Sequence, residues 1–173
     1  DIPVASDVSK GRADIVVHQN VNNLMEEIFR GLRTNIQFMM KPGQKVMMFT
    51  SSTSGEGKTF VASNVAISLA LLGKKVIVVG LDIRKPRLAE LFEIDNHHNG
   101  ITNLMVHEHN TWEDIQKQIL PSGVNGNLDL LMAGPVPPNP GELITRPSLD
   151  DIIAQLKEHY DYVVLDTAPV GLV

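Results

Sequence analysis

The chain of 173 residues contains no cysteine, one tryptophan and two tyrosines. The absence of cysteine excludes disulfides, thiolate metal sites and cysteine-ligated iron–sulfur clusters, and it is typical of a reducing compartment. Long apolar runs are also absent. The longest, residues 65–72, is already interrupted by Ser68, whereas a membrane-spanning helix needs about 20 apolar residues. The N-terminus has no basic segment followed by an apolar stretch, so no signal peptide is indicated.

Positive charge is in short supply as well, because 15 Lys and Arg face 20 Asp and Glu, for a net charge of −5. This balance argues against a nucleic-acid partner or an anionic membrane surface bound through bulk charge. The 43% hydrophobic and 20% charged residues are ordinary for a globular protein. We expect a polar N-terminal arm over residues 1–20, in which residues 15–17 are a candidate short strand, and one domain over residues 21–173.

Apolar periodicity predicts alternating helices and strands. A four-residue repeat, Leu24 to Ile36, predicts a helix over residues 21–40, which Pro42-Gly43 ends. Short apolar runs predict buried strands at residues 45–50, 75–79, 127–132 and 162–165. Further helices are expected at residues 58–72, 86–92 and 111–120, and after Ser148. Thr111 with Asp114, and Ser148 with Asp151, resemble capping boxes at the starts of the last two. This alternation predicts an α/β three-layer sandwich with a mostly parallel sheet.

A Ser/Gly-rich loop between the first strand and the following helix is typical of a P-loop. Its sequence, SSTSGEGKT over residues 51–59, has Ser52 where the usual motif has its first glycine. Backbone N–H groups of such a loop and of the helix N-terminus bind phosphates, the lysine reaches the β- and γ-phosphates, and the threonine ligates Mg²⁺. The alternative is a glycine-rich turn without chemistry. The predicted nucleotide-binding residues are Ser54, Gly55, Glu56, Gly57, Lys58, Thr59 and Phe60.

Two aspartates follow buried strands and are candidates for the carboxylate of the Mg²⁺ site. Asp166 ends the strand YVVLD, and Asp82 follows the strand KVIVV. Open α/β sheets bind ligands at the carboxyl ends of their strands. We therefore predict a metal site of Thr59, Asp82 and Asp166, although either aspartate alone could simply terminate a strand.

These motifs together resemble the bacterial tyrosine kinases, which are built on a P-loop ATPase fold. The loop at residues 51–59 is similar to their Walker A, VIVVGLDIRKP at 76–86 to their second Walker motif, and YVVLDTAP at 162–169 to their Walker B. AGPVPPNPGELI at 133–144 is similar to their proline-rich segment, and Glu27, Arg30 and Arg33 reproduce their ExxRxxR helix motif. The five matches occur in family order and span most of the chain.

The resemblance implies a kinase that transfers the γ-phosphate of Mg-ATP to tyrosines of a neighbouring subunit, with Lys58, Asp82, Arg84 and Asp166 as catalytic residues. It also implies a ring homo-oligomer, proposed as an octamer, whose contacts use Glu27, Arg30 and Arg33. A membrane adaptor domain, on the same chain or a separate one, activates such kinases. They act at the cytoplasmic face of the inner membrane in capsular or extracellular polysaccharide export, and we expect this stretch of chain itself to be soluble.

Two departures from the family pattern qualify these expectations. Gly80 stands where the family has the first aspartate of DxDxR, a candidate base for the tyrosine hydroxyl; we hypothesise that Asp82 takes over this role or that base catalysis matters little. The family also continues beyond Walker B into a tyrosine-rich tail, which we expect to be absent here. Neither Tyr160 nor Tyr162 is expected to be a phosphoacceptor.

Several bland or competing interpretations remain open. Glu27 and Arg30 could form an intrahelical ion pair, and Arg84, Lys85 and Arg87 a solvated turn rather than a phosphate-facing cluster. Four loop histidines, His97, His98, His107 and His109, lack a defined metal-ligand spacing. The competing functions are a non-catalytic ATP-gated scaffold and a partitioning-type ATPase, although the latter carries a signature lysine where this chain has Thr53.

Overall fold

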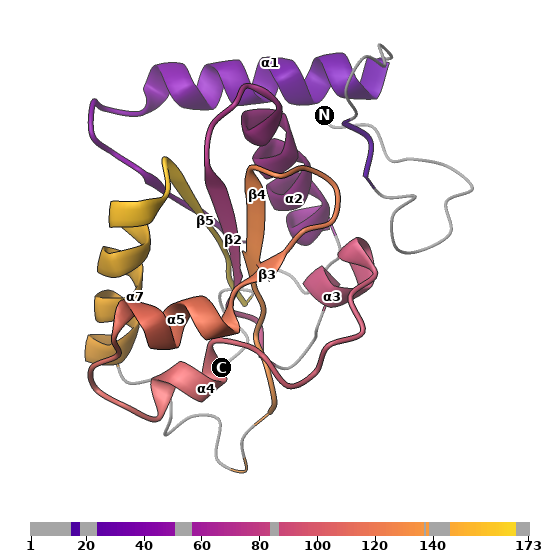
Figure 1. The fold of residues 1–173 in the computed structure, drawn as a ribbon. Helices are drawn as coiled ribbons and strands as arrows, with labels where there is room; N and C mark the ends of the chain where they lie inside the picture. Colours follow the sequence, from indigo (N-terminus) through magenta and orange to yellow (C-terminus); the bar gives the residue numbers. More distant parts are fainter. Residues whose placement is uncertain are drawn as a thin grey trace.

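The computed structural model describes residues 15–17, 24–50, 57–83, 87–136, 138 and 146–168. Their helices and strands alternate as the sequence predicts (Figure 1). The helices are α1 (Leu24–Met39), α2 (Gly57–Leu71), α3 (Arg87–Phe92), α4 (Thr102–Met105), α5 (Trp112–Gln118) and α7 (Arg146–His159). The strands are β1 (Val46–Phe49), β2 (Val76–Gly80), β3 (Leu120–Pro121), β4 (Leu128–Leu131) and β5 (Tyr162–Asp166).

The strands form one mostly parallel sheet in the order β1-β5-β2-β4-β3, in which only β3 pairs antiparallel. The central strands β2, β4 and β5 are apolar on both faces because helices cover both faces. Alternate residues of β2 enter different cores: Val76 and Val78 join the core with α1, α2 and α3, whereas Ile77 and Val79 join the core with α4, α5 and α7. The predicted three-layer α/β sandwich is therefore confirmed.

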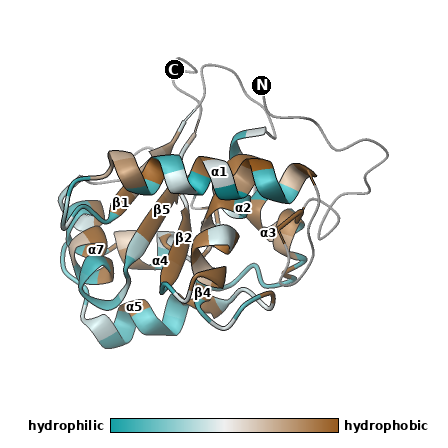
Figure 2. Ribbon diagram, turned by 90° about the horizontal axis from the view of Figure 1, so that it is seen from above, coloured by the Kyte–Doolittle hydropathy of each residue, from teal (hydrophilic) through white to brown (hydrophobic). Residues whose placement is uncertain are grey.

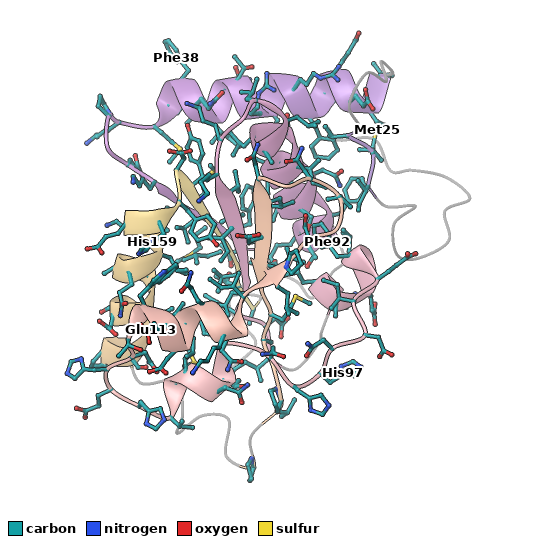
Figure 3. The ribbon with its side chains drawn as sticks, viewed as in Figure 1. Met25, Phe38, Phe92, His97, Glu113 and His159 are labelled. Atoms are coloured by element: carbon teal, nitrogen blue, oxygen red, sulfur yellow. The ribbon has the colours of Figure 1, made fainter. Side chains whose placement is uncertain are left out.

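The two helical layers differ in composition. Helix α2 is apolar nearly all round and buried from Ala62 to Ala70, because it is sandwiched between the sheet and α1 (Figure 2). Helix α1 is amphipathic, and its Phe29 ring packs edge-on against Phe60 of α2, with 5.5 Å between the ring centroids. Figure 3 shows Phe38, which is 91% exposed, pointing away from the molecule. None of the described helices is long and apolar enough to cross a membrane.

Turn and cap chemistry explains several element boundaries. Gly73 ends α2 with φ of 85°, a left-handed conformation that glycine adopts without the strain of a side chain. Thr111 and Asp114 form the predicted capping box of α5, since each side chain accepts a hydrogen bond from the backbone N–H of the other. Hydrogen bonding of the Asp114 carboxylate to the side chain of Thr111, and then to the Thr111 backbone N–H, lowers the pKa of Asp114.

Two local predictions are wrong, and two short elements were not predicted. Ser148 does not cap a helix: α7 begins earlier, at Arg146, and the buried Ser148 hydroxyl donates to the carbonyl of His107, 2.7 Å away. Residues 15–17 form no strand; Ile15 and Val17 are buried against α2, where the Val16 N–H donates to Asn64. Neither the four-residue helix α4 nor the two-residue strand β3 was predicted, because elements this short leave no periodicity.

Candidate functional site

The strand register brings the predicted site residues together. Asp166, the last residue of β5, lies level with Phe49 of β1 on one side and with Gly80 of β2 on the other. The predicted P-loop follows β1, and Asp82 lies two residues beyond Gly80. The N–H of Leu81 donates to the carbonyl of Asp166 at 2.8 Å, which fixes the exit of β2 against the end of β5. Three motifs far apart in sequence therefore meet at one edge of the sheet.

The first turn of α2 is bound to Asp166. Lys58 Nζ forms an ion pair with Asp166 Oδ1, and Thr59 Oγ1 donates to Asp166 Oδ2 at 2.8 Å. The Lys58 and Asp166 side chains are only 4% and 5% exposed, so both charges are withdrawn from water. Removing only one partner of a buried pair of this kind strongly destabilises the folded protein. Asp166 therefore holds both predicted P-loop side chains in a defined position.

Asp82 contributes an unsatisfied acceptor to the same edge. Its Oδ1 is buried and has no hydrogen-bond partner within the described part of the chain. Leaving such an atom unpaired costs about 1–3 kcal/mol, so a buried orphan oxygen indicates a missing donor or cation. With Thr59 and Asp166 it forms a set of oxygen donors, and oxygen is the ligand type that Mg²⁺ prefers. The described residues contain no group of three acidic, His or Cys side chains that could hold a metal by themselves. A site of two carboxylates completed by phosphate oxygens and water fits the chemistry of Mg²⁺.

A cavity of about 200 Å³ adjoins these residues. Gly80, Asp82 and Asp166 form part of its wall, and the segment that follows β4 forms another part. That segment, residues 132–136, includes the beginning of the proline-rich motif. Arg87, from the basic cluster that the sequence analysis considered as phosphate-facing, also lines the cavity. Further lining residues that the sequence analysis did not assign to the site are Leu88, Asn96, His97, Met132 and Val136. Residues 133–136 could have been assigned to the site from the sequence, because they directly follow the strand predicted at residues 127–132.

The loop after β4 is held in place by close contact with the loop before α4. Gly134 has φ of 85°, and a Cβ built on Gly100 would lie 2.2 Å from Gly134 Cα. The two loops can approach this closely only because both residues are glycines. The N–H groups of Ile101 and Thr102 donate to the carbonyls of Met132 and Ala133 at 2.8 and 3.0 Å. One wall of the cavity is thereby fixed to the body of the domain.

The remaining predicted site residues are placed as follows. The side chain of Phe60 contacts Phe29 rather than the cavity. Glu27 is exposed, the recorded ion pair of Arg30 goes to Glu26 at 3.4 Å, and Arg33 donates to Ser68 of α2 at 3.3 Å. Lying outside the described residues are Ser54, Gly55, Glu56 and Arg84.

The two tyrosines lie at the opposite, amino end of the strands. Tyr160 precedes β5 and is buried; its hydroxyl donates to the Asp129 carboxylate at 2.6 Å. Burial, and then this carboxylate, raise the pKa of Tyr160 well above its ordinary value. Tyr162 begins β5, and its hydroxyl accepts from Gln37 at 3.3 Å. Neither hydroxyl is presented to the cavity.

Comparison with known proteins gives consistent relatives. A family model described as an AAA domain matches residues 44–172. CapB of Staphylococcus aureus, whose name assigns it to the tyrosine-protein kinases, is 35% identical over 160 residues, covering 92% of this chain and 68% of CapB. Tyrosine-protein kinase YwqD of Bacillus subtilis is 32% identical over 163 residues, covering 94% of this chain and 66% of YwqD. The chain thus spans about two thirds of either relative.

Solved structures agree. The chimerical protein CapA2B2 superposes with a TM-score of 0.80 at 33% identity, covering 93% of this chain and 69% of that one. The kinase domain of the Escherichia coli tyrosine kinase Etk gives 0.75 at 32% identity, covering 85% and 56%. The septum site-determining protein MinD of Pyrococcus horikoshii, solved with Mg-ADP, shares the fold at 22% identity and a TM-score of 0.61 over 75% of this chain and 50% of MinD. On these matches and on the motifs that meet at the sheet edge, the chain belongs to the bacterial tyrosine kinase family.

Proposed function

We propose that the protein containing this domain transfers the γ-phosphate of ATP to protein tyrosines. The observation that carries the proposal is the meeting of Lys58, Thr59 and Asp166 at the carboxyl ends of β1, β2 and β5, beside a cavity. Phosphoryl transfer depends mainly on positioning and on neutralising the charge of the transferred group. Two carboxylates that line a cavity, one of them bound to a lysine and a hydroxyl, are the groups that this chemistry needs.

Nucleotide binding would change the partner of Lys58. Residues 54–60 would surround the phosphates with backbone N–H groups at the N-terminus of α2, and Lys58 would leave Asp166 for the β- and γ-phosphates. Thr59, Asp82 and Asp166 would then hold Mg²⁺, which supplies positive charge to the phosphates when bound. Arg84 would add a further positive charge. Oδ1 of Asp82, which has no partner among the described residues, would gain one.

The family supports a role for the whole protein in capsular or extracellular polysaccharide polymerisation and export. In this role the kinase would act at the cytoplasmic face of the bacterial inner membrane, beside an adaptor domain on the same polypeptide or a separate one. CapB and Etk, as the relatives with kinase names, support the assignment to this class of protein.

Self-assembly into a ring, an octamer in the family, would use Glu27, Arg30 and Arg33 of α1. Arg33 also has an intramolecular role, because it reaches Ser68 of the P-loop helix α2; burial, and then the charge of Arg30, lower its pKa. Glu27 is exposed and so is the cleanest probe of the interface. Light scattering of Glu27→Ala should show a smaller species, whereas Asn35→Ala, exposed on the same helix, should not. An unchanged size for Glu27→Ala, Arg30→Ala and Arg33→Ala would refute the interface.

Gly80 favours one alternative, a scaffold that binds ATP to control assembly without transferring phosphate, because it removes the family's candidate base. The two functions separate in one experiment. The full-length protein is incubated with Mg-ATP, and bound nucleotide and phosphotyrosine are measured together. Phosphotyrosine that forms in the unmodified protein and disappears in Lys58→Met supports the kinase. Bound ATP without phosphotyrosine would refute the kinase function and support the scaffold function.

A further inference from the structure

Position 80 poses a chemical problem that the cavity resolves. Gly80 has no side chain, and a Cβ built there would meet Ala133 N at 3.4 Å and Leu88 Cδ2 at 3.5 Å, which are ordinary contacts. The backbone at this position therefore tolerates a Cβ, although the sequence has none here. Asp82 is a poor replacement, because a carboxylate that ligates Mg²⁺ is neutralised by the metal and loses basicity. The proton of the acceptor hydroxyl needs another destination.

We propose that His97, oriented by Asp95 at the wall of the cavity, accepts the proton of the acceptor tyrosine. This inference rests on the proposed kinase function. His97 is the only histidine among the described residues that line the cavity beside Asp82 and Asp166. Its Nε2 lies 3.3 Å from Asp95 Oδ1. A carboxylate at this position favours the tautomer with the proton on Nε2, which leaves the lone pair on Nδ1 for a general base.

The loop that carries His97 is built to hold it. The side-chain oxygen of Asn96 accepts from the N–H groups of His98 and Asn99, both at 2.9 Å, and so closes a tight turn around His97. Asn103 donates to the carbonyl of His98 at 2.6 Å, which fastens the turn to α4. Such side-chain to backbone bonds fix a loop that has no helix or strand of its own. Figure 3 shows the labelled His97 in this loop after α3.

A general base must also release the proton that it has accepted. The His97 side chain is 72% exposed, so the imidazolium can release its proton to water after each turnover. The charged groups around the cavity are Asp82, Arg87 and Asp166, in addition to Asp95 on the same loop. Asp95 is not assigned to the metal, so it is the carboxylate that stabilises a transient imidazolium.

The proposed step balances. The tyrosine O–H proton passes to Nδ1 of His97 while the phenol oxygen forms its bond to the γ-phosphorus. The bond from that phosphorus to the β–γ bridging oxygen breaks, and its electron pair leaves with ADP. Because the transition state of phosphoryl transfer is loose, the base contributes toward the low end of general-base catalysis, about 100-fold.

The test compares phosphotyrosine formation by the full-length protein and three variants with saturating Mg-ATP. His97→Gln, which keeps a polar side chain without a base, should lower kcat by about 100-fold with unchanged ATP affinity. The matched control His98→Gln, on the same turn but not in the cavity wall, should retain the unmodified rate. Gly80→Asp combined with His97→Gln should recover most of the lost rate, since the aspartate supplies a base at the vacant position.

A pH profile separates catalysis from structure. The kcat of the unmodified protein should fall toward acid pH, and the kcat of His97→Gln should depend less on pH. An active unmodified protein with an equally active His97→Gln variant would overturn the inference and leave the kinase function intact. Equal losses in both histidine variants, without recovery by Gly80→Asp, would also overturn it. An unmodified protein that forms no phosphotyrosine would overturn the kinase function itself.

Discussion

Replacing Lys58 with methionine should destabilise the nucleotide-free protein as well as abolish catalysis. The Lys58 and Asp166 side chains are buried together, at 4% and 5% exposure. Methionine has a similar length and no charge, so it fills the space but leaves Asp166 without its cation. The hydroxyl of Thr59 then remains the one side-chain donor described for this carboxylate.

Removing one partner of a buried ion pair typically costs about 3–5 kcal/mol. For a domain of this size, 1 kcal/mol corresponds to about 2–4 °C in Tm, so a loss of ~3 kcal/mol lowers Tm by about 6–12 °C. Removing both charges is often nearly neutral. Lys58→Met combined with Asp166→Asn should therefore recover most of the stability lost in Lys58→Met, while remaining inactive.

Thermal unfolding at neutral pH, followed by circular dichroism without nucleotide, measures these differences. A Tm for Lys58→Met within 2 °C of that of the unmodified protein corresponds to a loss of less than about 1 kcal/mol in the free energy of unfolding. This result would refute the stabilising role of the buried pair. So would a double variant that is less stable than Lys58→Met.

Further predictions concern the framework of the site. Gly100→Ala should lower the free energy of unfolding by several kcal/mol, on the order of other strained substitutions, because its Cβ would lie 2.2 Å from the Gly134 backbone. Chemical denaturation measures this loss. The matched control is Gly126→Ala, since a Cβ at Gly126 has nothing within 4 Å. Thr111→Ala should cost about 1 kcal/mol through loss of the α5 cap. Since the pKa of Asp114 is lowered on folding, its stabilising effect is present above about pH 4 and is lost as pH falls through the folded pKa, and Thr111→Ala should flatten that part of a pH–stability curve. Tyr160 should carry no phosphate when the folded protein is analysed by peptide mass spectrometry after reaction with ATP, and its modification would contradict the buried bond to Asp129.

Much of the fold was predictable because its signals are local. Short apolar runs predicted the buried strands, and Gly73 and the Thr111 capping box mark helix ends that the structure confirms. Ser148 misled for a physical reason: a serine followed three residues later by an aspartate looks the same whether its hydroxyl caps its own helix or, as here, donates to a distant carbonyl. Tertiary contacts decide between the two.

The candidate site likewise combines residues predictable from a local motif with features that only tertiary contacts decide. Lys58, Thr59 and Asp166 could be predicted because their motif fixes both residue type and position after a strand. That Asp166 binds both α2 side chains, and that Asp82 keeps an unpaired oxygen, depends on strand register, which the sequence leaves open. His97 carried no motif at all. It enters the cavity wall only through a turn built by Asn96, whose bonds no periodicity predicts.

The central claim, that this sheet edge transfers phosphate to tyrosine, is tested most directly by mass spectrometry of the full-length protein after incubation with Mg-ATP. The inactive control is the variant with both Lys58→Met and Asp166→Asn, which should be folded and so excludes loss of structure as the cause of silence. Phosphotyrosine in the unmodified protein and none in the control is the predicted result. No phosphotyrosine in the unmodified protein, or equal amounts in both, would contradict the claim.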